Sequence, residues 1–177
     1  QKRRKMHGVA QELARAWGDR AERGRMSADL TLRASQPPRG TGIMTGEDIP
    51  DTGESGRARF YEIQVKAGDV PTGKALSTLQ RQGANGYMAA AMAGYLEWLI
   101  PQADQLPPYL EGLFYTYRET MQEITPGAHG RLHEAGACLL VGWTMATAYW
   151  MEIGAITPTQ AAEEAEAAQE AIASNIR

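Results

Sequence analysis

The sequence predicts a mainly α-helical fold, with two short strands followed by a C-terminal helical bundle. The 177 residues include 19 glycines and long alanine-rich stretches but only two phenylalanines, which favours closely packed helices over a sandwich of aromatic and β-branched strands. After Pro71 the chain is helical in character to its end. With 43% hydrophobic and 22% charged residues, the chain can bury one sizeable core but is too short for two full-size domains.

The N-terminal region is predicted to begin with an amphipathic helix from Lys2 to about Arg23. Gly24 ends the pattern, and residues 23–33 are expected to form an exposed loop or hairpin rich in arginine. Pro37 and Pro38 then hold the chain in an extended form. The helix carries one apolar stripe, formed by residues at three- and four-residue steps: Met6, Val9, Leu13 and Trp17.

Two short strands are predicted next, at residues 41–45 and 58–65. The first is a short apolar run between turn formers, which is typical of a buried strand. The polar residues 46–48 follow at its carboxyl end, where open α/β sheets place ligands. The second strand alternates apolar and polar residues between a flexible loop at 51–56 and a turn at Ala67 and Gly68. Two strands alone do not make a stable sheet.

Four helices are predicted in the second half of the chain. Pro101 stops the first, and Pro126 with Gly127 ends the second. The third is apolar nearly all round and is expected at the centre of the bundle. Its uncharged segment Ala135–Met151 is at the short limit for a membrane span, so we expect a bundle helix and no membrane partner. The four helices are Leu76 to about Ile100, Tyr109 to Glu123, about Ala128 to Ile153, and one capped by Thr157 with Pro158 at its first position.

Charge is divided unevenly along the chain. Residues 1–39 contain ten Lys and Arg against four Asp and Glu, and residues 40–177 contain eight against seventeen. The local balances are therefore +6 and −9. A basic segment attracts phosphates and an acidic one repels them, so any contact with DNA is expected within the first 39 residues. The simpler interpretation is a solvated helix face and a basic loop.

The segment Gly68-Asp-Val-Pro-Thr-Gly73-Lys74-Ala75 partly matches a phosphate-binding loop. The two glycines and the lysine have the right spacing, and the segment lies between a predicted strand and a helix. However, Ala75 stands where a hydroxyl would bind magnesium, and no later strand ends in the aspartate that completes the metal site. Gly68, Gly73 and Lys74 are therefore kept only as an alternative nucleotide site.

Arg57 and Arg59 lie at the start of the second predicted strand, after a loop expected to be mobile. On a regular strand both would face the same side, and a planar guanidinium held there can reach a γ-phosphate on a neighbouring subunit. Paired surface arginines more often make only weak salt bridges.

Neither the histidines nor the single cysteine predicts a metal site or a nucleophile. His129 and His133 share a helical face, but the residues between them lack the glutamate of a zinc hydrolase, and no third ligand is near. Cys138 lies in an apolar run and is expected to be a small core residue. A lone cysteine cannot form an intramolecular disulfide and no secretion signal follows the basic N-terminus, which favours a cytoplasmic location.

Taken together, several short segments resemble the C-terminal half of the superfamily-3-like primase-helicase ATPases of actinobacterial phages and integrated elements. The likeness covers about residues 1–100, and beyond them it is limited to helical character. The segments are Arg23-Gly-Arg-Met, Pro37-Pro-Arg-Gly40, Ile43-Met-Thr-Gly-Glu-Asp48, Ser55-Gly-Arg-Ala-Arg59, Gly68-Asp-Val70 and Gly86-Tyr-Met-Ala-Ala-Ala-Met-Ala-Gly-Tyr-Leu-Glu-Trp98.

The resemblance implies a hexameric DNA-translocating ATPase whose nucleotide loop and magnesium-binding carboxylates lie upstream of Gln1. Residues 1–70 would belong to its RecA/AAA+-like α/β core, and residues 71–177 would form the helical bundle. Thr45 would sense the γ-phosphate, and Arg57 or Arg59 would act as the arginine finger. ATP and Mg²⁺ are implied for the whole enzyme, with none expected on this chain alone. The DNA-contacting loop would carry four arginines: Arg23, Arg25, Arg33 and Arg39.

Two other functions remain open. One is a stand-alone nucleic-acid-binding module, in which the basic N-terminal helix follows the phosphate backbone and the acidic bundle contacts proteins. The other is a structural helical unit that serves oligomerisation and binds no ligand. Without the upstream strands of a motor, residues 41–45 and 58–65 would have to pack on the chain's own helices, pair across subunits or stay disordered.

Overall fold

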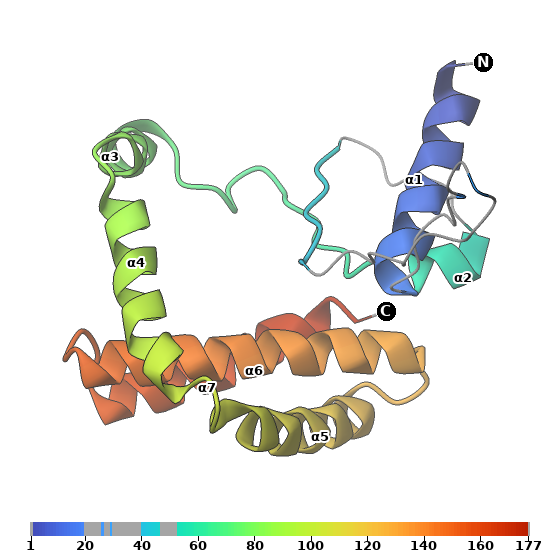
Figure 1. Ribbon diagram of the computed structural model, residues 1–177. Helices are drawn as coiled ribbons and strands as arrows, with labels where there is room; N and C mark the ends of the chain where they lie inside the picture. The colour runs from blue at the N-terminus through green and yellow to red at the C-terminus, as the bar shows by residue number, and fades with distance from the viewer. Residues whose placement is uncertain (1, 20–25, 27–28, 30–39, 47–52, 177) are drawn as a thin grey trace. The chain divides into compact units, whose positions relative to one another are not determined.

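The structure, a computed structural model, describes residues 2–19, 26, 29, 40–46 and 53–176 (Figure 1). Regular structure in these ranges is helical, which confirms the prediction of a mainly α-helical chain. The chain divides into two compact units, Gln1–Tyr61 and Glu62–Arg177. The sequence places the boundary slightly later, between residues 70 and 71.

The first unit contains two helices, α1 (Lys2–Gly18) and α2 (Gly53–Arg57). Ala10 and Ala14 are the buried residues of the apolar face of α1, because their small side chains allow close approach. The larger side chains of the predicted stripe, from Met6 to Trp17, remain about half exposed. The predicted amphipathic helix is therefore present but ends at Gly18 rather than near Arg23.

The two predicted strands are not formed. Residues 41–46 have no regular structure, and Ile43 is 91% exposed, so the expected buried strand is wrong. At the second position, Ala58 and Arg59 form a turn after α2, and residues 60–66 are irregular. The physical reason is that a short strand is stable only beside other strands, and the described residues offer none.

The second unit begins with α3 (Gly73–Ala84) and α4 (Tyr87–Leu99). The sequence predicts one continuous helix over this range. Asn85 and Gly86 interrupt it, and Gly86 takes a left-handed backbone conformation with φ of 82°, which glycine adopts without a steric cost. Pro101 lies in a short 3₁₀ turn, η1 (Ile100–Gln102), that ends α4 as predicted.

The bundle proper consists of α5 (Leu106–Ile124), α6 (Gly130–Glu152) and α7 (Pro158–Ser174). Helix α6 packs against both α5 and α7 and also contacts α4, so its predicted central place is confirmed (Figure 1). Thr157 begins α7 with a capping box: its hydroxyl accepts from the Gln160 N–H at 3.2 Å, and its own N–H donates to the Gln160 side chain at 2.9 Å.

The core of the bundle lies where α5 meets α6. Met121 of α5 is fully buried, and Ala137 and Leu140 of α6 are buried as well. Gly136 allows this approach, because a Cβ atom there would lie 3.1 Å from the Met121 side chain and 3.0 Å from Ile176 Cδ1. Small residues on α6 therefore set the distance between the packed elements.

Replacing Gly136 with leucine is expected to lower the free energy of unfolding by about 1–3 kcal/mol, because the added side chain overfills this contact. Gly142→Leu is the matched control, since a Cβ atom at Gly142 meets nothing within 4 Å in the same helix. Urea unfolding followed by circular dichroism measures both variants. Equal destabilisation by the two substitutions would contradict the packing described above.

The position of Cys138 differs from the one predicted. The structure places it on the exposed side of α6, whereas the sequence predicts a core residue. An apolar run nearly all round a helix hides which side faces the core, and in α6 Ala137 and Leu140 take that side. Within the described ranges, no helix is long and apolar enough to cross a membrane.

Three aromatic residues join α4 to α6. Tyr95 and Trp98 of α4 pack against Tyr149 of α6, each with ring centroids 5.6 Å from it. Gly94 admits the Tyr149 hydroxyl, which would lie within 2.5 Å of a Cβ atom at that position. Burial raises the pKa of the Tyr95 phenol from its ordinary value of 10.0.

This shift predicts a pH dependence of stability. The folded state holds the Tyr95 proton more tightly than the unfolded state, so the free energy of unfolding is expected to fall as the pH rises above 10.0. The Tyr95→Phe variant lacks this titration and should show a shallower fall. Urea unfolding between pH 9 and pH 11, about one unit on either side of the ordinary tyrosine value, tests it. An identical slope in the variant would disprove the assignment.

Candidate functional site

The candidate site in the first unit is built around the C-terminal end of α1. Asp19, directly after the helix, receives a bidentate interaction from the Arg59 guanidinium. Nη2 lies 2.9 Å from Oδ1 and 3.0 Å from Oδ2, and Nε lies 3.1 Å from Oδ1. The Arg59 side chain is only 11% exposed. The planar guanidinium donates through both Nε and Nη2 to the carboxylate. This contact fixes the turn after α2 against α1.

Gly18 makes room for the Arg59 side chain. A Cβ atom at position 18 would lie 2.7 Å from Cγ and Cδ of Arg59, so a larger residue would displace the arginine stem. The same end of α1 also holds the segment 40–46, because the Trp17 indole donates to the Gly40 carbonyl at 3.0 Å. The end of α1 therefore anchors two segments that are distant in sequence.

Arg57 differs from Arg59 although only Ala58 separates them. Arg57 is the last residue of α2 and is exposed, while Gly56 and Ala58 on either side of it are buried. Buried neighbours fix the backbone from which the exposed side chain extends. The sequence pattern does not distinguish the two arginines, but the structure shows them in different environments.

Thr45 lies in the irregular segment 40–46 of the same unit and is exposed. The segment is tied to α1 at Gly40, five residues before Thr45. The structure therefore places Thr45, Arg57 and Arg59 in one compact unit. Of these three residues, Arg59 makes the contact with Asp19 that anchors the turn after α2 to α1.

The four arginines predicted to contact DNA, Arg23, Arg25, Arg33 and Arg39, lie outside the described residues. The basic residues at positions 2–5 do fall on a described element, because α1 begins at Lys2. No acidic residue lies in the first turn of this helix.

The segment with the partial phosphate-loop pattern belongs to the second unit. Gly68 and Gly73 both have positive φ, at 101° and 61°, and Gly73 begins α3. Lys74 follows in the first turn and is exposed. Asp69 closes the preceding turn, its carboxylate accepting from the Lys66 N–H at 2.7 Å. The two glycines thus take conformations that suit glycine, in a unit separate from the one that carries Arg57.

His129 and His133 have hydrogen bonds within the protein. His129 precedes α6, and its Nδ1 accepts from the Arg131 N–H at 3.2 Å. His133 is buried, with Nε2 at 3.1 Å from the Thr125 carbonyl. Among the residues that the structure describes, no group of three His, Cys, Asp or Glu side chains could hold a metal ion. Both histidines therefore have a structural role at the α5–α6 connection.

Asp19 is the site residue that the sequence did not reveal. It lies 40 positions before Arg59 and belongs to no motif. Its one local signal is its place directly after a helix, which is where a chain often turns. Pairing across such a distance depends on the fold and leaves no periodic pattern.

Comparison of the chain with protein-family models, with curated proteins and with solved structures gives no match.

Proposed function

We propose that this chain is the C-terminal part of an ATP-dependent DNA helicase of the primase-helicase type that its motifs resemble. The observation that carries the proposal is the difference in position between two neighbouring arginines. Arg59 is anchored to Asp19, and Arg57 is exposed on a backbone whose neighbouring residues are buried. An arginine finger needs a firmly held backbone and a side chain at the protein surface.

In the assembled motor, Arg57 would reach the γ-phosphate of ATP bound by the adjacent subunit of a hexamer. A guanidinium there stabilises the charge that develops as the phosphoryl group is transferred. Thr45 would serve as the polar sensor of the same phosphate. ATP and Mg²⁺ would be held mainly by residues encoded upstream. The assembled motor would act in the cytoplasm.

The irregular segments 40–46 and 60–66 would gain strand structure within this assembly. Upstream strands of a RecA/AAA+-like core would offer them the neighbouring edge that the described residues lack. Such a change explains why sequence patterns typical of strands stand in segments that are irregular in this structure.

DNA would bind to the basic N-terminal part of the chain. Its charge of +6 over residues 1–39 contrasts with −9 over the remainder. A basic segment of this kind attracts a polyanion, so the charge division supports the proposed contact with DNA.

The direct test is the reading frame that precedes Gln1 together with the activity of the joined protein. We expect an upstream Gly-x-x-x-x-Gly-Lys-Ser/Thr loop, ATP hydrolysis by the joined protein and none by this chain alone. ATP hydrolysis by the purified chain alone, abolished by Lys74→Ala, would instead favour the local loop at Gly68–Ala75. A frame that starts at Gln1 would contradict the proposal.

Simultaneous replacement of Arg23, Arg25, Arg33 and Arg39 by alanine is expected to weaken DNA binding and its salt dependence. If all four contact phosphates, the slope of log K against log salt should become shallower by about 3–4. Fluorescence anisotropy of labelled duplex DNA at several salt concentrations measures it. The control replaces Lys66 and Arg81, both exposed in the second unit, and an equal effect there would disprove the assignment.

A nucleic-acid-binding module without motor activity is the second candidate, and the same charge division favours it. The two functions share the loss of DNA binding in the four-arginine variant. They differ at Arg57, because a pure binding module has no nucleotide for Arg57 to stabilise.

A further inference from the structure

We infer that the C-terminal end of α1, formed by Trp17, Gly18 and Asp19, is a positioning element that fixes Thr45 and Arg57 relative to one another. This role rests on the proposed function, in which both residues meet the same γ-phosphate. It adds three residues to the site that do not themselves touch the nucleotide. Two contacts at this helix end, one with each segment, support the assignment.

The first contact holds the turn that carries Arg57. The Arg59 guanidinium donates three hydrogen bonds to the Asp19 carboxylate, at 2.9–3.1 Å. Within the turn, the Arg59 N–H donates to the Gly56 carbonyl at 3.1 Å. The Phe60 N–H donates to the Arg57 carbonyl at 3.0 Å. Arg57 therefore lies in a hydrogen-bonded turn that Arg59 ties to α1.

The pair of Arg59 and Asp19 differs from an ordinary surface ion pair. Exposed pairs contribute little, because solvent screens them and two long side chains lose freedom. Here the Arg59 side chain is 11% exposed, and Gly18 lets its stem lie against the α1 backbone, where a Cβ atom would be 2.7 Å away. By contrast, Arg118 Nε lies 3.8 Å from Glu134 Oε1, and both side chains are more exposed. The pair at α1 therefore has the geometry that fixes a position.

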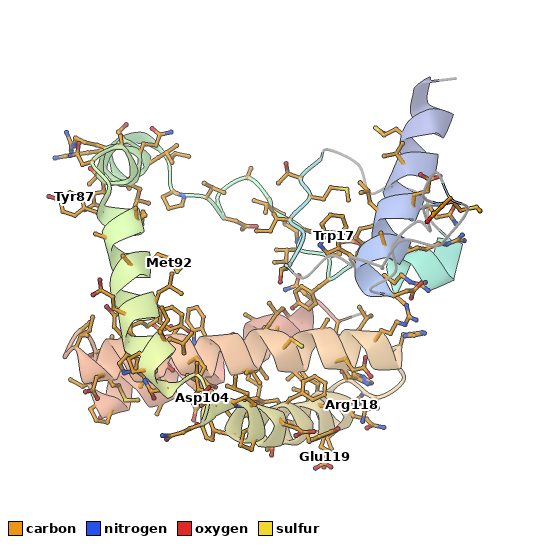
Figure 2. All side chains as sticks on the ribbon, viewed as in Figure 1. Trp17, Tyr87, Met92, Asp104, Arg118 and Glu119 are labelled. Atoms are coloured by element: carbon orange, nitrogen blue, oxygen red, sulfur yellow. The ribbon has the colours of Figure 1, made fainter. Side chains whose placement is uncertain are left out.

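The second contact holds the segment that carries Thr45. The Trp17 indole N–H donates to the Gly40 carbonyl at 3.0 Å, and Figure 2 shows the Trp17 side chain extending from α1 toward this segment. Gly42 lies against the same ring, because a Cβ atom at Gly42 would be 3.3 Å from Nε1. Thr45 follows shortly after Gly42 and is exposed. Its placement therefore depends on the contact with Trp17.

The two contacts share one stretch of helical backbone. Trp17 and Asp19 are two positions apart, and the Asp19 N–H donates to the Arg15 carbonyl at 2.9 Å, which continues the helical hydrogen bonds to Asp19. The segments that they hold are irregular at residues 40–46 and 60–66. The helix end thus supplies the regular backbone that both segments lack.

Two groups that act on one phosphate need a fixed separation. Groups at a catalytic site must be held within about 0.5 Å of the productive geometry, and a displacement of 1 Å can cost about a hundredfold in rate. Thr45 and Arg57 are distant in sequence, so no local structure sets the distance between them. Their shared attachment to the end of α1 does.

Electron paramagnetic resonance on this chain tests the positioning without nucleotide. Nitroxide labels are attached at Thr45→Cys and Arg57→Cys, both exposed positions, in a Cys138→Ser background. We expect a narrow distribution of distances between the two labels. Asp19→Ala or Trp17→Phe should broaden it, because each substitution removes one of the two contacts. A broad distribution in the parent protein, or the same narrow distribution in both variants, would overturn the inference.

Two controls separate local release from unfolding. A single label at Glu12→Cys, exposed on α1, should keep its spectrum in both variants, because the helix itself remains. Glu134→Ala removes the carboxylate of the weak ion pair in the second unit and should leave the distance distribution narrow. If Asp19→Ala unfolds α1, the Trp17→Phe variant decides, since it keeps an aromatic ring and loses only the indole and its N–H donor.

Kinetics of the protein joined to its upstream half test the role in catalysis. Asp19→Ala should lower kcat about a hundredfold and leave nucleotide affinity unchanged. The loss should vanish in an Arg59→Ala background, because Asp19 acts through Arg59. Losses that multiply in the double variant, or weaker affinity with full kcat, would refute the positioning role. A joined protein without ATP hydrolysis would contradict the proposed function instead, and the label distances would then decide the inference.

Discussion

Replacing Arg57 with alanine in the protein joined to its upstream half is expected to lower the rate of ATP hydrolysis about a thousandfold or more. An arginine finger contributes a factor of about 10³–10⁵, since its guanidinium stabilises charge that is present only in the transition state. ATP affinity should change little. Phosphate release measures the rate, and binding of a fluorescent nucleotide measures the affinity.

Arg118→Ala provides the control for this loss. Arg118 is a partly exposed arginine of α5, 3.8 Å from Glu134 in a weak ion pair, and its removal should leave hydrolysis unchanged. Arg59→Ala should lower activity too, by releasing the turn from Asp19, and should also lower the stability of the first unit. Full hydrolysis in a folded Arg57→Ala protein would exclude the finger.

Replacing Met121 with alanine is expected to lower the free energy of unfolding of the bundle by about 3 kcal/mol, within the range of 2–5 kcal/mol for such changes. Met121 is 0% exposed, and Gly136, which lies against it, has no side chain that could fill the space. Urea unfolding monitored by circular dichroism gives the value directly.

Met151→Ala in α6 is the matched control, because it deletes the same atoms from a side chain that is 40% exposed. We expect a change well under half that of Met121→Ala. Similar losses for both substitutions would show that Met121 is not the centre of the core.

Helices bounded by strong local signals were predictable from the sequence. Thr157 with Pro158 begins α7 as predicted, and Pro101 ends α4 within two residues of the expected place. The break at Gly86 was missed, since apolar periodicity continues on both sides of it. The two strand predictions were wrong for a different reason. The sequence patterns are typical of strands, but a strand is stable only beside other strands, which the described residues do not supply.

The site was predictable only in part. Spacing alone singled out Arg57 and Arg59, yet it gave no sign that Arg59 pairs with Asp19, 40 residues away. The position of Cys138 was wrong since a helix that is apolar nearly all round gives no sign of which face is covered. Long-range pairing and the choice of a buried face are properties of the packed chain.

The central claim is that Arg57 acts on a nucleotide held by a different subunit, and a mixing experiment tests it most directly. One inactive variant carries Arg57→Ala, and the other carries alanine at the lysine of the upstream nucleotide loop. The proposal predicts that mixed oligomers regain ATP hydrolysis, because an intact loop then meets an intact arginine across some subunit boundaries. Mixtures that assemble but remain as inactive as each variant alone would contradict it.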